Sequence, residues 1–252
     1  MRVCSIVDLG LIPYAEAWEL QKRVVAARKA GAIGDVLLFC QHPHVITLGR
    51  SGNRANLLAS ENVLRQKGVE FFETTRGGDI TYHGPGQIVG YAILDLAAIR
   101  RDVVWYVRGL EEAMIRATAE LGIAARREAG KTGIWVDAQE RTASPSEQRK
   151  EETAEKLAAI GVHISRWVTS HGFAYNVATD LRYFEMIVPC GIADRKATSL
   201  EKLLGRNVSP AEIKPLLAKH VGEVFGLTVR TGETAVLFKR LQEFEQALPV
   251  SA

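Results

Sequence analysis

Short apolar runs of strand length and helical segments follow one another in an irregular order along this chain of 252 residues. Four runs are almost wholly apolar and predict buried strands: 36–40, 44–48, 88–94 and 133–136. The spacing of apolar residues predicts helices over 14–30 and 103–121, each followed at once by a glycine. Because strands and helices do not alternate strictly, the order favours an α+β fold, a mixed β-sheet flanked by helices, over a doubly wound parallel sheet.

The other expected elements are shorter or lie towards the C-terminus. They are a helix over 60–66, strands over 69–74, 159–164 and 172–177, and helices over 210–224 and 234–246. From about residue 198 we expect the chain to be helical. The segments 198–201 and 209–212 both fit a capping box, and Pro210 stands at the first helical position of the second. We interpret residues 1–252 as a single domain.

The stretch 138–155 differs in composition from the segments around it. It is rich in serine and charged residues and has no periodic apolar positions. Such a composition cannot bury enough apolar surface to fold by itself. Since expected strands continue on both sides, we predict a flexible polar insertion in one domain and not a linker between two domains.

The composition excludes several classes of protein. Hydrophobic residues make up 47% and charged residues 24% of the chain, and the net charge is +3. These values are ordinary for a water-soluble protein. No apolar stretch is long enough to span a membrane, the first twenty residues do not read as a secretory signal, and no basic stripe interleaved with aromatics suggests nucleic-acid binding. The three cysteines form no pair typical of disulfides, metals or redox motifs, so we expect free thiols in the cytoplasm and no metal.

Cys190 lies between Pro189 and Gly191 and is the candidate nucleophile. A cysteine attacks as the thiolate, whereas a thiol with an ordinary pKa of about 8.5 is mostly protonated at neutral pH. A cation beside the sulfur lowers the pKa of the thiol, and Lys156 and His171 are the candidates for this cation. An ammonium about 4 Å away interacts with a thiolate by about 4 kcal/mol at an effective dielectric constant near 20, which is ample. Taken alone, such a cysteine is more often a buried structural residue.

The glycine-rich passage 76–87 suggests a substrate surface. Glycines let the backbone approach a bulky ligand and leave amide N–H groups free to face it, while Arg76 and His83 bracket the surface with polar groups. The spacing matches neither a Walker loop nor a dinucleotide-binding fingerprint, so we expect no nucleotide there. His42 and His44 flank a proline without other ligand types nearby, which favours packing over metal binding.

Four motifs in this order resemble the octanoyltransferase family of lipoate biosynthesis, also called lipoate-protein ligase B. They are the segments 76–87, 156–162, 169–177 and 189–192, and the run 41–50 resembles the first strand of that family, which contains His-Pro. The resemblance covers roughly residues 5–205. It implies a fold similar to the catalytic domains of biotin and lipoate protein ligases. The long insertion before Lys156 departs from the family pattern.

The resemblance also implies an activity. Such enzymes move an octanoyl group from octanoyl-acyl carrier protein to a lysine of lipoyl domains, in 2-oxoacid dehydrogenases and the glycine cleavage H protein. By this likeness Cys190 holds the acyl group as a thioester, Lys156 tunes the thiol and moves its proton, and no cofactor is needed. The implied substrate-binding residues are Arg76, Gly77, Gly78, Asp79, Ile80, Thr81, Tyr82, His83, Ala159, Ile160, Gly161, His171, Gly172, Phe173 and Ala174.

Three other functions stay open at this point. An ATP-dependent lipoate or biotin ligase of the same fold also uses a central lysine, but its adenylate chemistry needs no thiol such as Cys190. An octanoyl amidotransferase between carrier proteins follows the same thioester logic with other partners. A binding module for acyl carriers that has lost its activity has no need to keep Cys190 together with Lys156.

Overall fold

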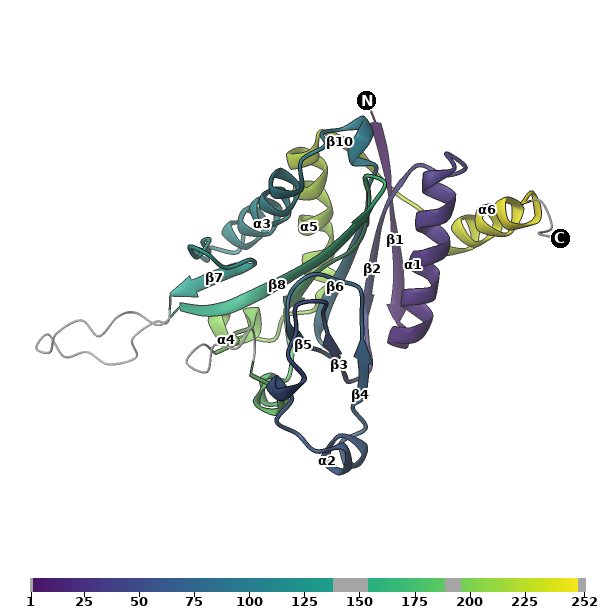
Figure 1. Ribbon diagram of the computed structural model, residues 1–252. Helices are drawn as coiled ribbons and strands as arrows, with labels where there is room; N and C mark the ends of the chain where they lie inside the picture. The colour runs from purple at the N-terminus through teal and green to yellow at the C-terminus, as the bar shows by residue number, and fades with distance from the viewer. Residues whose placement is uncertain (1, 138–153, 189–195, 249–252) are drawn as a thin grey trace, which may run out of the picture.

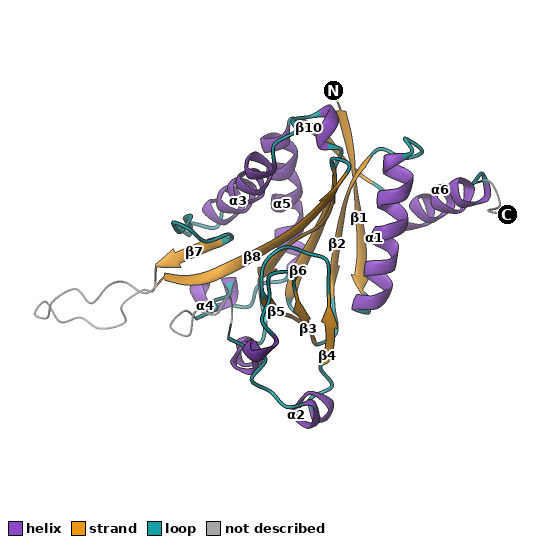
Figure 2. Cartoon of the chain, in the orientation of Figure 1, coloured by secondary structure: helices purple, strands orange, loops and turns teal. Residues whose placement is uncertain are grey.

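The computed structural model describes residues 2–137, 154–188 and 196–248. A seven-stranded sheet forms the centre, in the order β10-β1-β2-β6-β9-β8-β7 (Figures 1 and 2). Its strands are β1 (Arg2–Leu11), β2 (Asp35–Gln41), β6 (Gln87–Ile93), β7 (Ile134–Asp137), β8 (Ala154–Ser165), β9 (Val168–Asn176) and β10 (Leu227–Thr231). The pairs of β1 with β10 and β2 are parallel and the remaining pairs are antiparallel, so the sheet is mixed, as predicted.

A second sheet has three strands in the order β4-β3-β5. They are β3 (Val45–Leu48), β4 (Glu70–Glu73) and β5 (Ile80–His83). This small sheet has its own apolar cluster, which includes Ile46, Tyr82 and Met186. In Figure 1 it lies below the centre of the main sheet, beside the short helix α2 (Glu61–Gln66).

Helices cover both faces of the main sheet. The helices α3 (Val103–Ala119) and α5 (Pro210–Phe225) lie side by side on one face, and α1 (Tyr14–Lys29) and α6 (Thr234–Gln246) contribute to the core on the other (Figure 1). Strand β2 shows why its sequence is apolar without interruption. Leu37 and Phe39 belong to the core under α3, whereas Leu38 and Cys40 belong to the core under α1. A strand buried on both faces has no polar side to alternate with.

Most predicted elements are confirmed within one to three residues. The capping box of α5 is present, with Ser209 as the N-cap, Glu212 as its partner and Pro210 at the start of the helix. Cys40 is fully buried in β2, as predicted from its apolar strand. The packing role expected of the two histidines is also observed. His42 is hydrogen-bonded to Ile12 O, and the ring of His44 stacks on Tyr183 with centroids 4.1 Å apart.

Other predictions are wrong or incomplete. Strands β1 and β10 were not expected, because both carry polar residues on exposed positions and are held by parallel pairing with each other. The glycine-rich passage contains strand β5, and β10 interrupts the C-terminal part that was expected to be helical. The first capping box is absent, since Ser199 and not Thr198 is the N-cap of α4 (Leu200–Leu204).

The predicted flexible stretch 138–155 is wrong at its last two residues. Ala154 and Glu155 pair with Asp137 and Val136 of β7, so they belong to β8. Residues 138–153 lie outside the described residues. In the described part of the chain no helix combines the length and the apolar character needed to cross a membrane.

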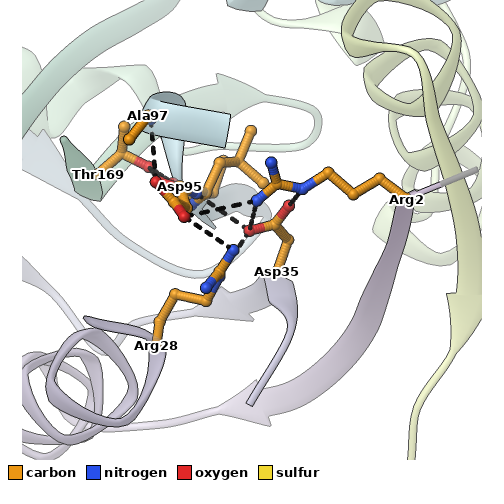
Figure 3. A network of polar contacts seen from close by, with 8 residues as sticks. Arg2, Arg28, Asp35, Asp95, Ala97 and Thr169 are labelled. Carbon is orange, nitrogen blue, oxygen red and sulfur yellow. Dashed lines mark hydrogen bonds and ion pairs between the residues drawn. The ribbon is translucent and has the colours of Figure 1, made fainter. Parts of the chain in front are cut away.

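A cluster of four charged side chains ties the start of β1 to its neighbours (Figure 3). Asp35 at the start of β2 accepts hydrogen bonds from Arg2 Nε and from Arg28 Nε, both at 2.8 Å. Asp95 accepts from Arg28 Nη2 at 3.2 Å and donates its own backbone N–H to Asp35 at 3.0 Å. The cluster therefore links β1, the end of α1, β2 and the segment after β6.

Candidate active site

A cavity of about 280 Å³ is lined by residues from both sheets. The main sheet contributes residues of β6, β7, β8 and β9, and the small sheet contributes β5 with the turn before it. Tyr14 of α1 and Phe184 of the turn η3 (Leu181–Met186) also line it. Sequence positions from 14 to 197 thus meet around one space. A concave, largely preformed cavity of this kind is the usual place for a small ligand.

Four small residues of β8 and β9 line the cavity, Ala159, Gly161, Gly172 and Ala174, and we call this part its floor. They belong to two neighbouring cross-strand rows, which Val89 and Tyr91 of β6 extend: Val89, Ala174 and Ala159 in one, and Tyr91, Gly172 and Gly161 in the next. A Cβ atom on Gly172 would lie 2.1 Å from Gly90 O, and one on Gly161 would lie 2.7 Å from Gly77 O. Glycine is therefore required at both positions, and with the alanines it leaves room for an extended apolar chain.

A β-bulge directs Lys156 into the cavity. Ile134 pairs with Ala158 but Trp135 pairs with Lys156, so β8 carries one extra residue, Leu157. Leu157 and Ala158 are both fully buried in the core under α3. Two successive residues on one face shift the alternation of the strand, and Lys156 consequently lies on the opposite, cavity-lining side. Bulges commonly re-aim a side chain beside an active site in this way.

The backbone of Lys156 is held by the segment that follows residues 189–195. Its N–H donates to Lys196 O at 2.9 Å, and its carbonyl accepts from Thr198 N at 3.0 Å. Lys196 and Ala197 line the cavity as well. Cys190, the predicted nucleophile, lies outside the described residues.

A chain of hydrogen bonds runs along one wall of the cavity, with Gln87 at its centre. Gln87 Nε2 donates to Tyr82 O at 3.2 Å and to Asn176 Oδ1 at 2.9 Å, which uses both of its protons. Gln87 Oε1 therefore accepts from His83 Nδ1, 2.7 Å away. Asn176 Nδ2 continues the chain by donating to Thr198 O at 3.0 Å. The directions of the bonds fix His83 as the Nδ1–H tautomer.

The chain ends at Arg76. Thr47 Oγ1 lies 3.4 Å from His83 Nε2 and accepts from Arg76 Nε at 3.1 Å and from Arg76 Nη2 at 2.9 Å. Arg76 Nη2 also donates to Thr47 O at 2.6 Å. The guanidinium is thus anchored to β3, and Arg76 is part of the cavity lining.

The histidines around the cavity are neutral at physiological pH. Burial lowers the pKa of His83 to about 3, helped by the nearby His42 and Arg76. Burial and the charge of Arg76 lower the pKa of His171 to about 3, and burial lowers that of His42 to about 4. His42 Nδ1 donates to Ile12 O, so its Nε2 accepts from the Tyr91 hydroxyl at 2.7 Å. A neutral His171 cannot supply the cation that a thiolate needs, which leaves Lys156 of the two sequence candidates.

Most of the predicted substrate-binding residues line this cavity. They are Arg76, Gly78, Asp79, Ile80, Thr81, His83, Ala159, Ile160, Gly161, His171, Gly172, Phe173 and Ala174, together with Lys156.

Two predicted residues are not part of the cavity lining. Gly77 donates its N–H to Val162 O at 2.9 Å and joins the turn to β8. Tyr82 stacks on Tyr183 with ring centroids 5.0 Å apart, and its hydroxyl is hydrogen-bonded to His44 Nδ1 at 2.7 Å. Strand alternation explains the second case, since Thr81 and His83 point to one side of β5 and Tyr82 to the other.

Several lining residues were not predicted as site residues: Tyr14, Gln87, Val89, Tyr91, Lys131, Trp135 and Asn176. Gln87 and Asn176 lie inside the motifs 76–87 and 169–177, so the motifs could have indicated them. Tyr14 and Trp135 lie in a helix and a strand without any motif, and their places follow only from the packing of distant elements.

Comparison with known proteins agrees with this architecture. Residues 13–222 match the family described as the lipoyl protein ligase A/B catalytic domain. The match covers well over half of the chain, and the chain belongs to this family.

Relatives within the family share a common name. The octanoyltransferase of Solibacter usitatus is 48% identical over 92% of this chain and 97% of its own length. The octanoyltransferase of Acidobacterium capsulatum is 52% identical over 79% of this chain and 80% of its own length.

Similar solved structures support the fold. A bipartite lipoate protein ligase from Thermoplasma acidophilum superposes with a TM-score of 0.72 at 15% identity, covering 98% of this chain and 93% of that one. A lipoate-protein ligase A bound with ATP superposes with a TM-score of 0.69 at 16% identity, covering 98% and 95%. At such identities the likeness concerns the fold alone, which matches the predicted fold class.

Proposed function

We propose that this protein is an octanoyltransferase that moves an octanoyl group from octanoyl-acyl carrier protein to a lysine of lipoyl domains through a thioester on Cys190. The observation that carries the proposal is the 48% identity, over 92% of the chain, to a relative named octanoyltransferase. The cavity adds support, because its floor of alanines and glycines fits an unbranched apolar chain. The acceptors are the lipoyl domains of 2-oxoacid dehydrogenases and the glycine cleavage H protein.

The reaction has two balanced steps. In the first, the Cys190 thiolate attacks the thioester carbonyl of the donor, the new C–S bond forms, and the donor thiol leaves with a proton. In the second, the ε-amine of the acceptor lysine attacks the enzyme thioester, a C–N bond forms, and the C–S bond to Cys190 breaks. The energy of the donor thioester drives both steps, so no nucleotide is consumed. Division into two easier transfers is the general advantage of covalent catalysis.

Lys156 acts as the proton carrier and as the positive charge beside the sulfur. Its side chain lines the cavity, and its backbone is hydrogen-bonded to residues 196 and 198. Those residues follow Cys190 by six and eight positions. An ammonium close to the sulfur stabilises the thiolate and can protonate the leaving thiolate of the donor. The proton that Lys156 gives up in the first step is regained from the acceptor amine in the second.

The polar wall of the cavity takes no part in this proton transfer. His83 and His171 remain neutral because burial lowers the pKa of each to about 3. Gln87 and Asn176 have their amide groups committed to each other and to neighbouring atoms. These groups bind and orient, whereas the reacting proton moves between sulfur, amine and Lys156.

An ATP-dependent ligase is the principal alternative, because the solved structures of similar fold include a ligase bound with ATP. The two functions differ in their requirement for nucleotide and for the thiol. An octanoyl amidotransferase differs in its acceptor. We expect the protein to work in the cytoplasm, where Cys190 stays reduced.

Intact-mass spectrometry tests the proposal. After mixing with octanoyl-acyl carrier protein and no ATP, the protein should gain the mass of one octanoyl group, and Cys190→Ala should gain none. Cys40→Ala is the matched control, since burial raises the pKa of the Cys40 thiol far above its usual range and keeps it unreactive. The adduct should then pass to an unmodified lipoyl domain. A strict need for ATP, or an adduct that survives in Cys190→Ala, contradicts the proposal.

A further inference from the structure

We propose that Trp135 is a positioning residue that holds the Lys156 ammonium in the cavity through a cation–π contact. The Lys156 Nζ atom lies 4.6 Å from the centroid of the Trp135 ring. Both residues line the cavity. The inference rests on the proposed function, in which Lys156 assists Cys190, and it adds a residue that no motif marks.

The pairing of β7 with β8 brings the two side chains together. Trp135 and Lys156 are direct cross-strand partners in the antiparallel ladder, immediately beside the bulge at Leu157. Side chains of direct partners lie on the same face of a sheet and within contact distance. The bulge that turns Lys156 towards the cavity thus also places it against the indole.

The indole itself is held firmly. Trp135 is 2% exposed. On the outer edge of β7, Trp135 N donates to Arg126 O at 2.9 Å and Trp135 O accepts from Arg126 N at 2.8 Å. Arg126 is fixed in turn by ion pairs with Asp137 and Glu128. The ring therefore belongs to a rigid ladder and not to a loop, which suits a residue that must define the place of a flexible partner.

A lysine needs such a partner more than most catalytic groups do. Its charge sits at the end of a flexible four-carbon stem, and without restraint it samples many positions. An indole face attracts an ammonium within about 6 Å of its centroid, most strongly where water is excluded. Lys131 Nζ also lies within this range, at 5.4 Å from the same centroid, and Lys131 lines the cavity too. The indole thus concentrates positive charge at the end of the cavity where residue 156 lies.

The expected consequence is a smaller thiolate fraction at Cys190 when the ring is lost. Trp135→Leu keeps an apolar side chain but removes the π face. We expect the alkylation of Cys190 by iodoacetamide to slow about tenfold at neutral pH, and the midpoint of its pH profile to rise by about one pH unit. Trp135→Phe keeps an aromatic face and should recover most of the rate. Quantifying the alkylated peptide by mass spectrometry makes the readout independent of donor and acceptor.

Trp105→Leu is the matched control. Trp105 lies in α3, away from the cavity lining, and is also near a cation, with Arg100 Cζ 5.6 Å from its ring. Loss of packing alone should affect the two tryptophan variants similarly and should leave both pH profiles unchanged. If Trp135→Leu shows the profile of Trp105→Leu, or if Trp135→Phe is no better than Trp135→Leu, the inference is overturned. Trp135→Phe also serves if the leucine variant does not fold, since its profile should then lie between those of the wild type and Lys156→Ala.

Lys156→Ala, measured in parallel, separates this inference from the proposed function. A raised midpoint in Lys156→Ala with a normal one in Trp135→Leu overturns the role of Trp135 and leaves the function intact. An unchanged midpoint in Lys156→Ala overturns the role of Lys156 and, with it, the role of Trp135. Failure of the wild type to accept an octanoyl group overturns the proposed function, whereas the alkylation profiles still report whether Trp135 positions Lys156.

Discussion

Two polar networks in this molecule offset the cost of removing polar groups from water, one with opposite charges and the other with neutral hydrogen bonds. The cluster at the start of β1 is ionic and compact, with two arginines and two aspartates in contact (Figure 3). The chain along the cavity wall is neutral from Thr47 to Asn176 and lines an open space. Both satisfy groups that would be costly to bury alone.

The ionic cluster shows how charges are buried where no ligand enters. The Asp35 side chain is fully buried and accepts from two guanidinium groups and one backbone N–H. Removing one member leaves a buried charge without its counter-charge, which destabilises the folded state. Such a cluster is therefore stabilising only while all of its members are present.

The cavity chain shows a different requirement. Under the proposed function an apolar acyl chain enters this cavity, and a free charge on the wall would have to give up its solvation each time the chain entered. Neutral groups with committed hydrogen bonds avoid that cost. The comparison suggests that the ionic cluster serves stability, whereas the wall from Thr47 to Asn176 is neutral and the charges of Arg76, Lys131 and Lys156 lie elsewhere in the cavity lining.

The largest predicted effect is that of acid on the three neutral, buried histidines around the cavity, of which His83 belongs to the neutral chain. His42, His83 and His171 have pKa values lowered to about 4, 3 and 3 in the folded protein, whereas an unfolded histidine has a pKa of about 6.5. Above about pH 6.5 both states are neutral, and below it the unfolded state binds more protons. Stability should therefore fall from about pH 6.5 towards pH 4, by about 2 kcal/mol per histidine at pH 5.

Urea unfolding at several pH values measures this dependence. In the matched variant His42→Gln, the free energy of unfolding should fall less between pH 6 and pH 5, by the contribution of one histidine out of three. A wild-type stability that is flat over this range contradicts the neutral burial of these rings.

The next effect concerns the ionic cluster. Asp35→Asn leaves Arg2 and Arg28 with Asp95 as their remaining carboxylate, and we expect a loss of roughly 3–5 kcal/mol in the free energy of unfolding. The exposed pair of Asp180 and Arg182 provides the control, since Asp180→Asn keeps a capping side chain and should cost at most about 1 kcal/mol. Equal losses of unfolding free energy in Asp35→Asn and Asp180→Asn would show that burial does not make the ionic cluster more important for stability than an exposed ion pair. Acylation by the folded fraction of Asp35→Asn should be normal.

The smallest effect is expected at the centre of the cavity chain. Gln87→Leu deprives His83 and Asn176 of their partner, at a cost of about 1–3 kcal/mol, because water can enter the open cavity and replace part of what is lost. Unlike Asp35→Asn, it should also weaken the capture of octanoyl donor, seen as a raised KM. Gln66→Leu on the exposed side of α2 is the control. A stability loss in Gln87→Leu without any change in KM would show that this chain of hydrogen bonds does not contribute to donor binding.

The sequence predicted the fold class and most elements well, because apolar runs and helix caps are local signals. Lys156, Arg76 and the glycines of the floor were found through motifs. The positions of Tyr14 and Trp135 were not, since a residue of α1 and one of β7 reach the cavity only after distant strands have paired. Strands β1 and β10 were missed for the same reason, because each is specified more by its parallel neighbour than by its own composition.

The bulge in β8 constrains the spacing of residues in the motif Lys-Leu-Ala-Ala-Ile-Gly at 156–161. Because strand residues alternate between two faces, inserting one residue between Lys156 and Leu157 would turn the lysine into the apolar core beneath α3, whereas deleting Leu157 would remove the bulge and keep the lysine on the cavity side. The number of residues between Lys156 and Ala159 therefore matters as well as their identity, and a relative with one additional residue here should be inactive even with both cysteine and lysine intact.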